Sequence, residues 1–282
     1  MRSGTVDCGA VLIDKPVGVT SHDVVFDVRR RLSREVGRRV KTGHAGTLDP
    51  FATGLLVVLI GRATRLQRYL QHQPKTYRVV AKLGWTSDSG DVDGELTETG
   101  RVPDDPQLPV GELELPVPAY SAIKVDGQRL YAKARRGEEF APPVRTMTVY
   151  RAERMDLNGD RATFELDCAG GTYVRSVVAT LEDAYCEELR RTKVGELSID
   201  DADPDALVDP DGVLSHLPAV DVSADQAATL IHGRRLDAGA FAAGDAVRVR
   251  LDSHLLGVGR VADGLMAPET ILAASVEELL AR

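Results

Sequence analysis

Apolar residues in the first part of the chain follow two patterns, which predict short buried strands and one amphipathic helix. Apolar runs within 10–14 and over 55–60 predict strands buried in a sheet. Between them, Thr20 and Asp23 form the pattern of a helix-capping box. Val24, Val25, Val28 and Leu32 follow at helical spacing, with arginines on the other side. Further along, the pattern predicts a short basic helix at 63–70 and a strand at 76–83. It also predicts strands at 147–155 and 162–168, which a hairpin turn at Asn158-Gly159 joins. A helix is predicted at 174–189.

An acidic segment separates these elements from a smaller C-terminal part. Between Asp200 and Asp211 the chain has six Asp and two Pro, which predicts a solvated connector. We therefore expect two domains, at 1–205 and 213–282. Within the second, residues 246–251 and 255–262 predict strands of a small β-rich module. Residues 84–118 are rich in Gly, Pro and acidic residues and show no period.

Composition excludes several classes of protein. Hydrophobic residues make up 43% of the chain, which is enough for a folded core. No apolar run approaches the roughly 18–20 residues that span a bilayer, and the first residues lack the apolar stretch of a signal peptide. Cys8, Cys168 and Cys186 are far apart and form no CxxC pair, so we expect reduced thiols in a cytoplasmic protein.

Charge is distributed unevenly along the chain. The net charge of −8 argues against binding of nucleic acid through bulk positive charge. Residues 29–82, however, hold 13 Lys and Arg against two Asp and Glu, a local net charge of +11. Most of these cations are Arg, whose planar fork of donors suits phosphate oxygens. A solvated helix face is the alternative for one such cluster, but two clusters flank the same glycine-rich loop.

That loop, Gly43-His-Ala-Gly-Thr-Leu-Asp-Pro-Phe-Ala-Thr-Gly54, carries the most chemical information. Asp49 stands between Gly46 and Pro50, directly before a predicted buried strand. Rigid backbone there can hold a carboxylate toward a cleft. Taken alone, an aspartate that hydrogen-bonds its own backbone in a turn is the competing interpretation.

The loop resembles the catalytic loop of the TruB family of tRNA pseudouridine synthases, and six more segments resemble motifs of that family in the same order. They are Asp14-Lys-Pro-Val-Gly-Val-Thr-Ser21, Lys75-Thr-Tyr77, Gly84 to Gly94, Pro118-Ala-Tyr-Ser-Ala-Ile-Lys124, Gly171-Thr-Tyr-Val-Arg-Ser176, and Leu189-Arg-Arg-Thr192 with Gly195. Seven ordered motifs between residue 10 and about residue 197 are highly specific. The C-terminal part resembles the small PUA-like module of bacterial members.

The resemblance implies an α+β fold, with a large mixed, mainly antiparallel sheet flanked by helices. It implies isomerisation of uridine to pseudouridine at position 55 in the T-arm of tRNA. Asp49 is then the essential catalytic residue, Arg175 the cation that keeps its carboxylate ionised by lowering its pKa, and Tyr77 the aromatic that brackets the uracil as acid or base. No metal or cofactor is called for.

The target base lies inside folded RNA and must be flipped out. The resemblance assigns His44 to packing against the rearranged T-loop, Tyr173 to packing at the active centre and Lys124 to an RNA contact. It also places a mobile insertion at about 125–146 that we expect to order on RNA. The expected partner is tRNA, with no membrane and no protein partner, and we expect a monomer.

Two departures and two alternatives accompany this interpretation. Residues 95–117 carry Pro103, Pro106, Pro109 and Pro116 where the family commonly has a helix, so a peripheral surface is expected to differ. The overall acidity is unusual. One alternative is the catalytic subunit of a guide-RNA-directed particle, although 282 residues leave little room for its larger terminal segments. The other is a tRNA-folding chaperone whose isomerase activity is secondary.

Overall fold

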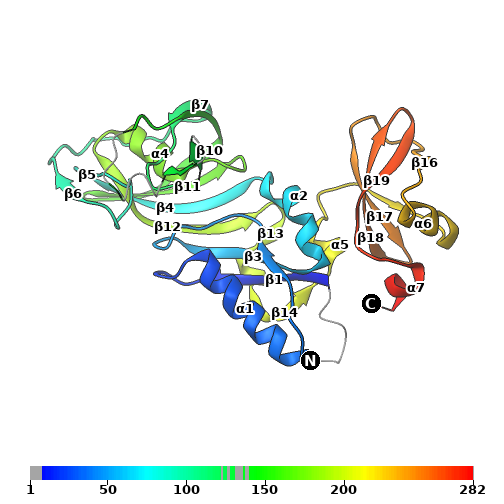
Figure 1. Cartoon of the computed structure of the whole chain (residues 1–282). Helices are drawn as coiled ribbons and strands as arrows, with labels where there is room; N and C mark the ends of the chain where they lie inside the picture. The colour runs from blue at the N-terminus through cyan, green and yellow to red at the C-terminus, as the bar shows by residue number, and fades with distance from the viewer. Residues whose placement is uncertain (1–7, 122, 126–127, 131–135, 137–139, 282) are drawn as a thin grey trace.

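The computed structural model describes residues 8–121, 123–125, 128–130, 136 and 140–281, and its main body is one ten-stranded sheet (Figure 1). The path through the sheet is β14 (Asp203–Val208), β1 (Cys8–Lys15), β3 (Thr53–Gly61), β12 (Ala184–Val194), β4 (Lys75–Leu83), β11 (Arg161–Cys168), β10 (Val144–Asn158) and β7 (Gly111–Pro116). The short strands β2 (Thr42–His44) and β13 (Leu197–Ser198) pair with β3 and β12. Only the β12–β3 pair is parallel among these described strands, so the expected mixed, mainly antiparallel sheet is confirmed.

Helices cover both faces of the N-terminal strands. Helix α1 (Ser21–Glu35) begins at the capping box of Thr20 and Asp23, as predicted, and buries Val25, Val28 and Leu32 against one face of β1 and β3. A 3-10 turn at Arg62–Leu66 and helix α2 (Gln67–Gln71) pack on the other face. Because both faces are covered, the seven residues from Gly54 to Ile60 are all buried, which explains the continuous apolar run of this strand.

The predicted helix at 174–189 is wrong beyond its first turns. Helix α4 spans Val174–Val178, a 3-10 turn follows at Ala179–Leu181, and Glu182 ends the helical segment with a φ of 65°. Residues 184–194 are β12, which pairs with β3 on one side and β4 on the other. Apolar residues at 174, 177, 178 and 181 have helical spacing, whereas sheet pairing decides the conformation of the residues after them.

The acidic segment also differs from a simple connector. Residues Asp203–Val208 form the exposed edge strand β14, which pairs with β1. Helix α5 (Pro210–Val213) follows, so the segment is solvated, as expected, but is partly built into the large sheet. The division at 1–205 and 213–282 stays a prediction.

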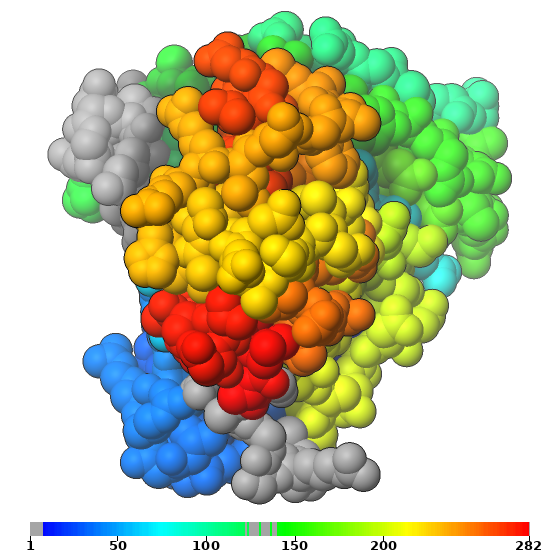
Figure 2. All heavy atoms as spheres, turned by 90° about the vertical axis from the view of Figure 1, so that its right-hand side faces the viewer, coloured from blue at the N-terminus to red at the C-terminus, as the bar shows by residue number. Residues whose placement is uncertain are grey.

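A second, five-stranded sheet forms the C-terminal part and lies against the large sheet beside α2 and α5 (Figures 1 and 2). Its strands are β15 (Ala219–Asp221), β17 (Ala246–Leu251), β18 (His254–Ala262), β19 (Leu265–Ile271) and β16 (Leu236–Asp237), with helices α6 (Ala224–Ile231) and α7 (Val276–Leu280). Leu255, Val258 and Leu272 join the same buried cluster as Leu66 and Leu70. The two sheets therefore share apolar core.

Two further sheets have two described strands each. They are β5 (Trp85–Ser87) with β6 (Leu96–Glu98), and β8 (Lys124–Val125) with β9 (Gln128–Arg129). Among the described residues, no helix has the length and apolar character that crossing a membrane requires.

Candidate active site

A cavity of about 580 Å³ opens where the Asp49 loop faces the middle of the large sheet. The described residues around it come from the Asp49 loop, the end of α2, strands β4 and β12, the segment before β8 and the turn into α4. They are Gly46, Thr47, Leu48, Asp49, Pro50, Gln71, His72, Lys75, Tyr77, Tyr120, Ser121, Gly170, Gly171, Thr172, Tyr173, Val174, Arg175, Leu189 and Arg191. Five of the seven motif segments thus meet at one site.

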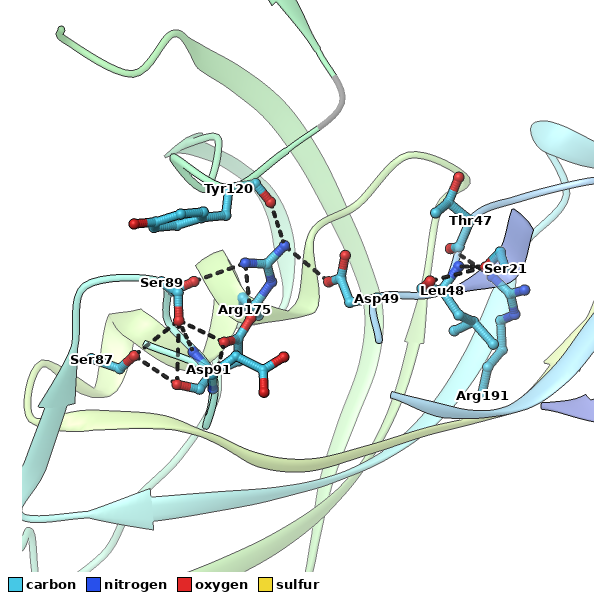
Figure 3. Close-up of polar contacts among 11 residues, drawn as sticks. Ser21, Thr47, Leu48, Asp49, Ser87, Ser89, Asp91, Tyr120, Arg175 and Arg191 are labelled. Carbon is cyan, nitrogen blue, oxygen red and sulfur yellow. Dashed lines mark hydrogen bonds and ion pairs between the residues drawn. The ribbon is translucent and has the colours of Figure 1, made fainter. Parts of the chain in front are cut away.

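Asp49 and Arg175 form an ion pair in this cavity (Figure 3). The Arg175 Nη2 atom lies 2.9 Å from the Asp49 Oδ2 atom. The Arg175 side chain is 4% exposed, whereas that of Asp49 is 35% exposed because it faces the cavity. The predicted pairing of these two residues is therefore present in the structure.

Arg175 also contacts a second carboxylate, that of Asp91, at 3.0 Å from Nη1. The same guanidinium donates to the backbone oxygens of Ser89 at 2.8 Å and Tyr120 at 3.0 Å. Asp91 accepts in turn from the Ser89 hydroxyl at 2.5 Å and the Asp93 amide at 3.1 Å. One buried cation is thus fixed by four acceptors, which leaves it little freedom to leave Asp49.

The surroundings raise the pKa of Asp49 above its ordinary value. Burial is the largest cause; Arg175 opposes it, and the negative charge of Asp91 adds to it. We expected Arg175 to hold this pKa low. Arg175 does favour the ionised form, but it does not outweigh the loss of water around the carboxylate.

Tyr77 lies on β4 and is 7% exposed, with its side chain lining the cavity. Burial raises the pKa of its phenol above the ordinary value. The hydroxyl is therefore protonated at neutral pH, which suits a hydrogen-bond donor or acid. Action as a base would need the proton to leave the hydroxyl during the reaction.

Buried side chains from distant segments hold the backbone of the Asp49 loop. Arg191, 1% exposed, donates to the oxygens of Gly46 at 3.0 Å, Thr47 at 3.4 Å and Leu55 at 2.8 Å. The Ser21 hydroxyl contacts both the amide and the carbonyl of Leu48, at 2.8 and 2.9 Å. Figure 3 shows Ser21, Leu48, Thr47 and Arg191 on the side of Asp49 away from Arg175. They position Asp49 without touching its carboxylate.

Two buried lysines flank the same loop. Lys15 donates to the oxygens of Pro16, Val19 and Pro50, and burial lowers its pKa. Lys75 donates to two carbonyls, of Gln71 and Gln73, and burial together with the charge of Arg191 lowers its pKa to about 8. Both ammonium groups donate to backbone carbonyl oxygens, so these hydrogen bonds leave the positive charge of the lysines un-neutralised.

Of the residues predicted to contact RNA, Tyr173 lines the cavity and His44 does not. Tyr173 stands directly before α4 and lines the cavity. His44 ends β2 and is not among the cavity residues; burial lowers its pKa, so its imidazole is neutral at pH 7. Lys124 lies in β8, but its side chain is outside the described residues. The same holds for most of the predicted insertion at 125–146, including residues 126–127, 131–135 and 137–139.

Sequence reasoning did not single out Asp91, Arg191 or Lys15 as site residues. Each lies within a segment that was recognised as a motif, so the signal was present. Burial of a charged side chain could not be read from the local pattern, because the partners are far away in the sequence. The described residues contain no cluster of three or more His, Cys, Asp or Glu side chains that could hold a metal ion.

Comparison with known proteins identifies both parts of the chain. Residues 30–174 match the model of the TruB family pseudouridylate synthase N-terminal domain, and residues 218–272 match the C-terminal domain of pseudouridine synthase II TruB. A tRNA pseudouridine synthase B of Dechloromonas aromatica is 36% identical, over 94% of this chain and 95% of its own. One of Aquifex aeolicus is 34% identical, over 94% and 99%. The solved structure of a Cbf5–Nop10–Gar1 complex shares the fold, with a TM-score of 0.70 at 22% identity over 97% of this chain and 87% of that one.

Proposed function

Because the chain belongs to the TruB family of pseudouridine synthases, we propose that it isomerises uridine 55 in the T-arm of tRNA by chemistry centred on Asp49. Pseudouridine formation on tRNA is the activity that its curated relatives carry in their names. The position of the uridine and the roles of single residues are our proposal. The observation that carries it is the 2.9 Å ion pair of Asp49 and Arg175 in the cavity.

The reaction is an isomerisation, in which the bond from the ribose to uracil N1 is replaced by a bond to uracil C5. Asp49 acts on the ribosyl carbon or its neighbour, so that the uracil is released, rotates and is rejoined through C5. The C5 hydrogen is lost as a proton and N1 gains one. The cavity of about 580 Å³ is within the range of pockets that enclose small ligands, which fits one flipped nucleotide.

Two side chains define the chemical environment of that nucleotide. Arg175 keeps the Asp49 carboxylate in place and favours its ionised form. The protonated Tyr77 hydroxyl lines the cavity and can bracket the freed uracil and supply a proton. Tyr173 adds a second aromatic wall, which suits packing against a flipped base.

Release of tritium from uridine C5 tests the proposal directly. Purified protein is incubated, without guide RNA, with unmodified tRNA that carries tritium at uridine C5. We expect release from the T-arm uridine, and pseudouridine mapping locates the product. Release that requires a guide RNA, or product at another position, would overturn the assignment to uridine 55.

Asp49→Asn is the matched control, since it keeps the shape of the side chain and removes its charge. We expect no release from this variant, while tRNA binding survives. Wild-type turnover by Asp49→Asn would contradict a mechanism centred on the carboxylate and would favour a binding or chaperone role.

A further inference from the structure

The C-terminal end of α1 carries a basic surface hollow that the catalytic cavity does not include. The hollow has a volume of about 500 Å³, and five of its eight lining residues are arginines. The lining consists of Phe26, Arg29, Arg30, Ser33, Arg34, Gly37, Arg38 and Arg39, here called the arginine hollow. None of these eight is acidic.

Two groups of arginines within residues 29–82 have different contacts; Arg31, which pairs with Asp205, and Arg78 belong to neither group. Arg62, Arg65 and Arg68 reach the C-terminal sheet: Arg62 pairs with Glu278, Arg68 pairs with Glu269, and Arg65 donates to the oxygen of Ile271. In the arginine hollow, Arg34 and Arg39 are exposed and form no ion pair with a described residue. Arg30 pairs with Asp27 at 3.4 Å, so Arg34 and Arg39 carry the positive charge of the hollow that no described carboxylate neutralises.

Phe26 gives the arginine hollow an aromatic component. Its side chain is 46% exposed, and the Arg29 guanidinium lies 5.2 Å from its ring centre. Guanidinium groups bind phosphate oxygens, while an exposed aromatic and a stacked guanidinium offer flat surfaces to a nucleobase. This combination fits nucleic acid better than it fits a protein partner with scattered carboxylates.

The arginine hollow lies away from the catalytic cavity. Helix α1 packs on the face of β1 and β3 opposite α2, and its first residue, Ser21, contacts the Asp49 loop. A helix of 15 residues is about 22 Å long, which separates its C-terminal end from that loop. In Figure 2 the blue segment around this end projects beside α7 and is not covered by the C-terminal sheet.

We propose that the arginine hollow binds the phosphate backbone of the substrate tRNA outside the T-arm, and this rests on the proposed function. An RNA whose T-loop enters the cavity carries further nucleotides on both sides of that arm. The hollow adjoins β2 through Val40, whose amide donates to Ser33 at 3.0 Å. Since β2 begins two residues after Val40 and ends in His44, one short segment joins the hollow to the predicted T-loop contact.

The test compares two RNAs and two double variants. Arg34→Gln with Arg39→Gln neutralises the hollow, and Arg154→Gln with Arg161→Gln removes the same charge from β10 and β11, toward the opposite edge of the sheet. Dissociation constants are measured for full-length unmodified tRNA and for an isolated T-arm stem-loop, at several salt concentrations. Thermal unfolding verifies that both variants are folded.

We expect the hollow variant to bind full-length tRNA about tenfold more weakly than the wild type. The slope of the logarithm of the binding constant against the logarithm of the salt concentration should become less steep by about 1 for each phosphate contact that is lost. Its affinity for the stem-loop and the affinities of the control variant should stay at the wild-type values. Equal weakening for both RNAs, or no weakening for either, would overturn the proposal. Failure of the wild type to form pseudouridine in either RNA would instead overturn the proposed function, because the binding comparison does not depend on turnover.

Discussion

Asp49 and Asp91 contact the same guanidinium from opposite environments. Asp49 faces the cavity with 35% of its side chain exposed, whereas Asp91 is 6% exposed and accepts two further hydrogen bonds. The pKa of Asp49 is raised, so its ionised form is less stable in the folded protein than in the unfolded chain. The chemistry that needs this charge therefore works against folding.

Asp49→Asn is expected to remove activity while leaving the unfolding temperature at neutral pH equal to or higher than that of the wild type. The physical reason is linkage: a carboxylate with a raised folded pKa costs stability at pH values above that pKa. The cost disappears as the pH falls toward the ordinary value of 3.8. Thermal unfolding of both proteins between pH 4 and 8 measures this difference, and a clearly less stable variant at pH 7 would contradict it.

Asp91→Asn is expected to behave differently from Asp49→Asn, although both substitutions replace a carboxylate by an amide. It deprives Arg175 of a buried partner, and we expect a loss of about 1–3 kcal/mol in the free energy of unfolding. It also removes a negative charge that raises the pKa of Asp49. The acid limb of the single-turnover rate should therefore move to lower pH, while the rate at neutral pH falls because Arg175 is held less firmly. An acid limb that moves to higher pH would refute this coupling.

At the scale of elements, the backbone at the start of β3, where the Asp49 loop joins the large sheet, lies very close to β12. Gly54 has a φ of 101°, and a Cβ there would lie 2.2 Å from the Arg191 carbonyl oxygen on β12. Both the conformation and the close approach require glycine. The pairing of β3 and β12 also carries the Arg191 side chain to the Asp49 loop.

Gly54→Ala is expected to destabilise the protein by about 2–4 kcal/mol, from backbone strain and the steric overlap. Turnover should fall further than the folded fraction, because the loop carrying Asp49 shifts. Gly43→Ala is the control: its nearest contact would be 3.9 Å away, and it should leave stability within about 0.5 kcal/mol. Chemical denaturation and activity are measured on the same samples of both variants. Equal effects of the two substitutions would contradict the requirement for glycine at position 54.

The elements that the sequence predicted well are those whose pattern is set locally. Helix α1 has its capping box and apolar spacing within 15 residues, and the β10–β11 hairpin has Asn158-Gly159 at its turn. The helix predicted at 174–189 wrongly includes the first half of β12, because the place of β12 between β3 and β4 is set by pairing with residues more than a hundred positions away. Arg175 was found through its motif, but Asp91 as its second partner could not be, since only the fold brings them together.

For the whole molecule, the shared apolar cluster makes the two sheets depend on each other. Leu272 follows β19, is fully buried, and packs in the cluster that also holds Leu66 and Leu70 beside the large sheet. Ion pairs of Arg62 and Arg68 surround this contact, but such surface pairs contribute little. Apolar burial is therefore what holds the sheets together.

We expect a single calorimetric unfolding transition for the wild type. Leu272→Ala should destabilise the protein by about 2–5 kcal/mol through the cavity it leaves. Leu279→Ala, in a cluster within the C-terminal part, provides a comparison of equal size. Two well-separated transitions in the wild type would show that the sheets unfold independently.

The anchoring of the Asp49 loop by Arg191 bears on how the chain folds. The hydrogen bond from Arg191 to Leu55 joins residues 136 positions apart, and the one to Gly46 joins residues 145 apart. Contacts of such sequence separation form late, because a long loop must close before they contribute. A ribosome-bound chain that ends before residue 191 would hold the Asp49 loop and its neighbouring strands without the side chain that fixes them. The catalytic geometry can thus be acquired only after two-thirds of the protein has been made.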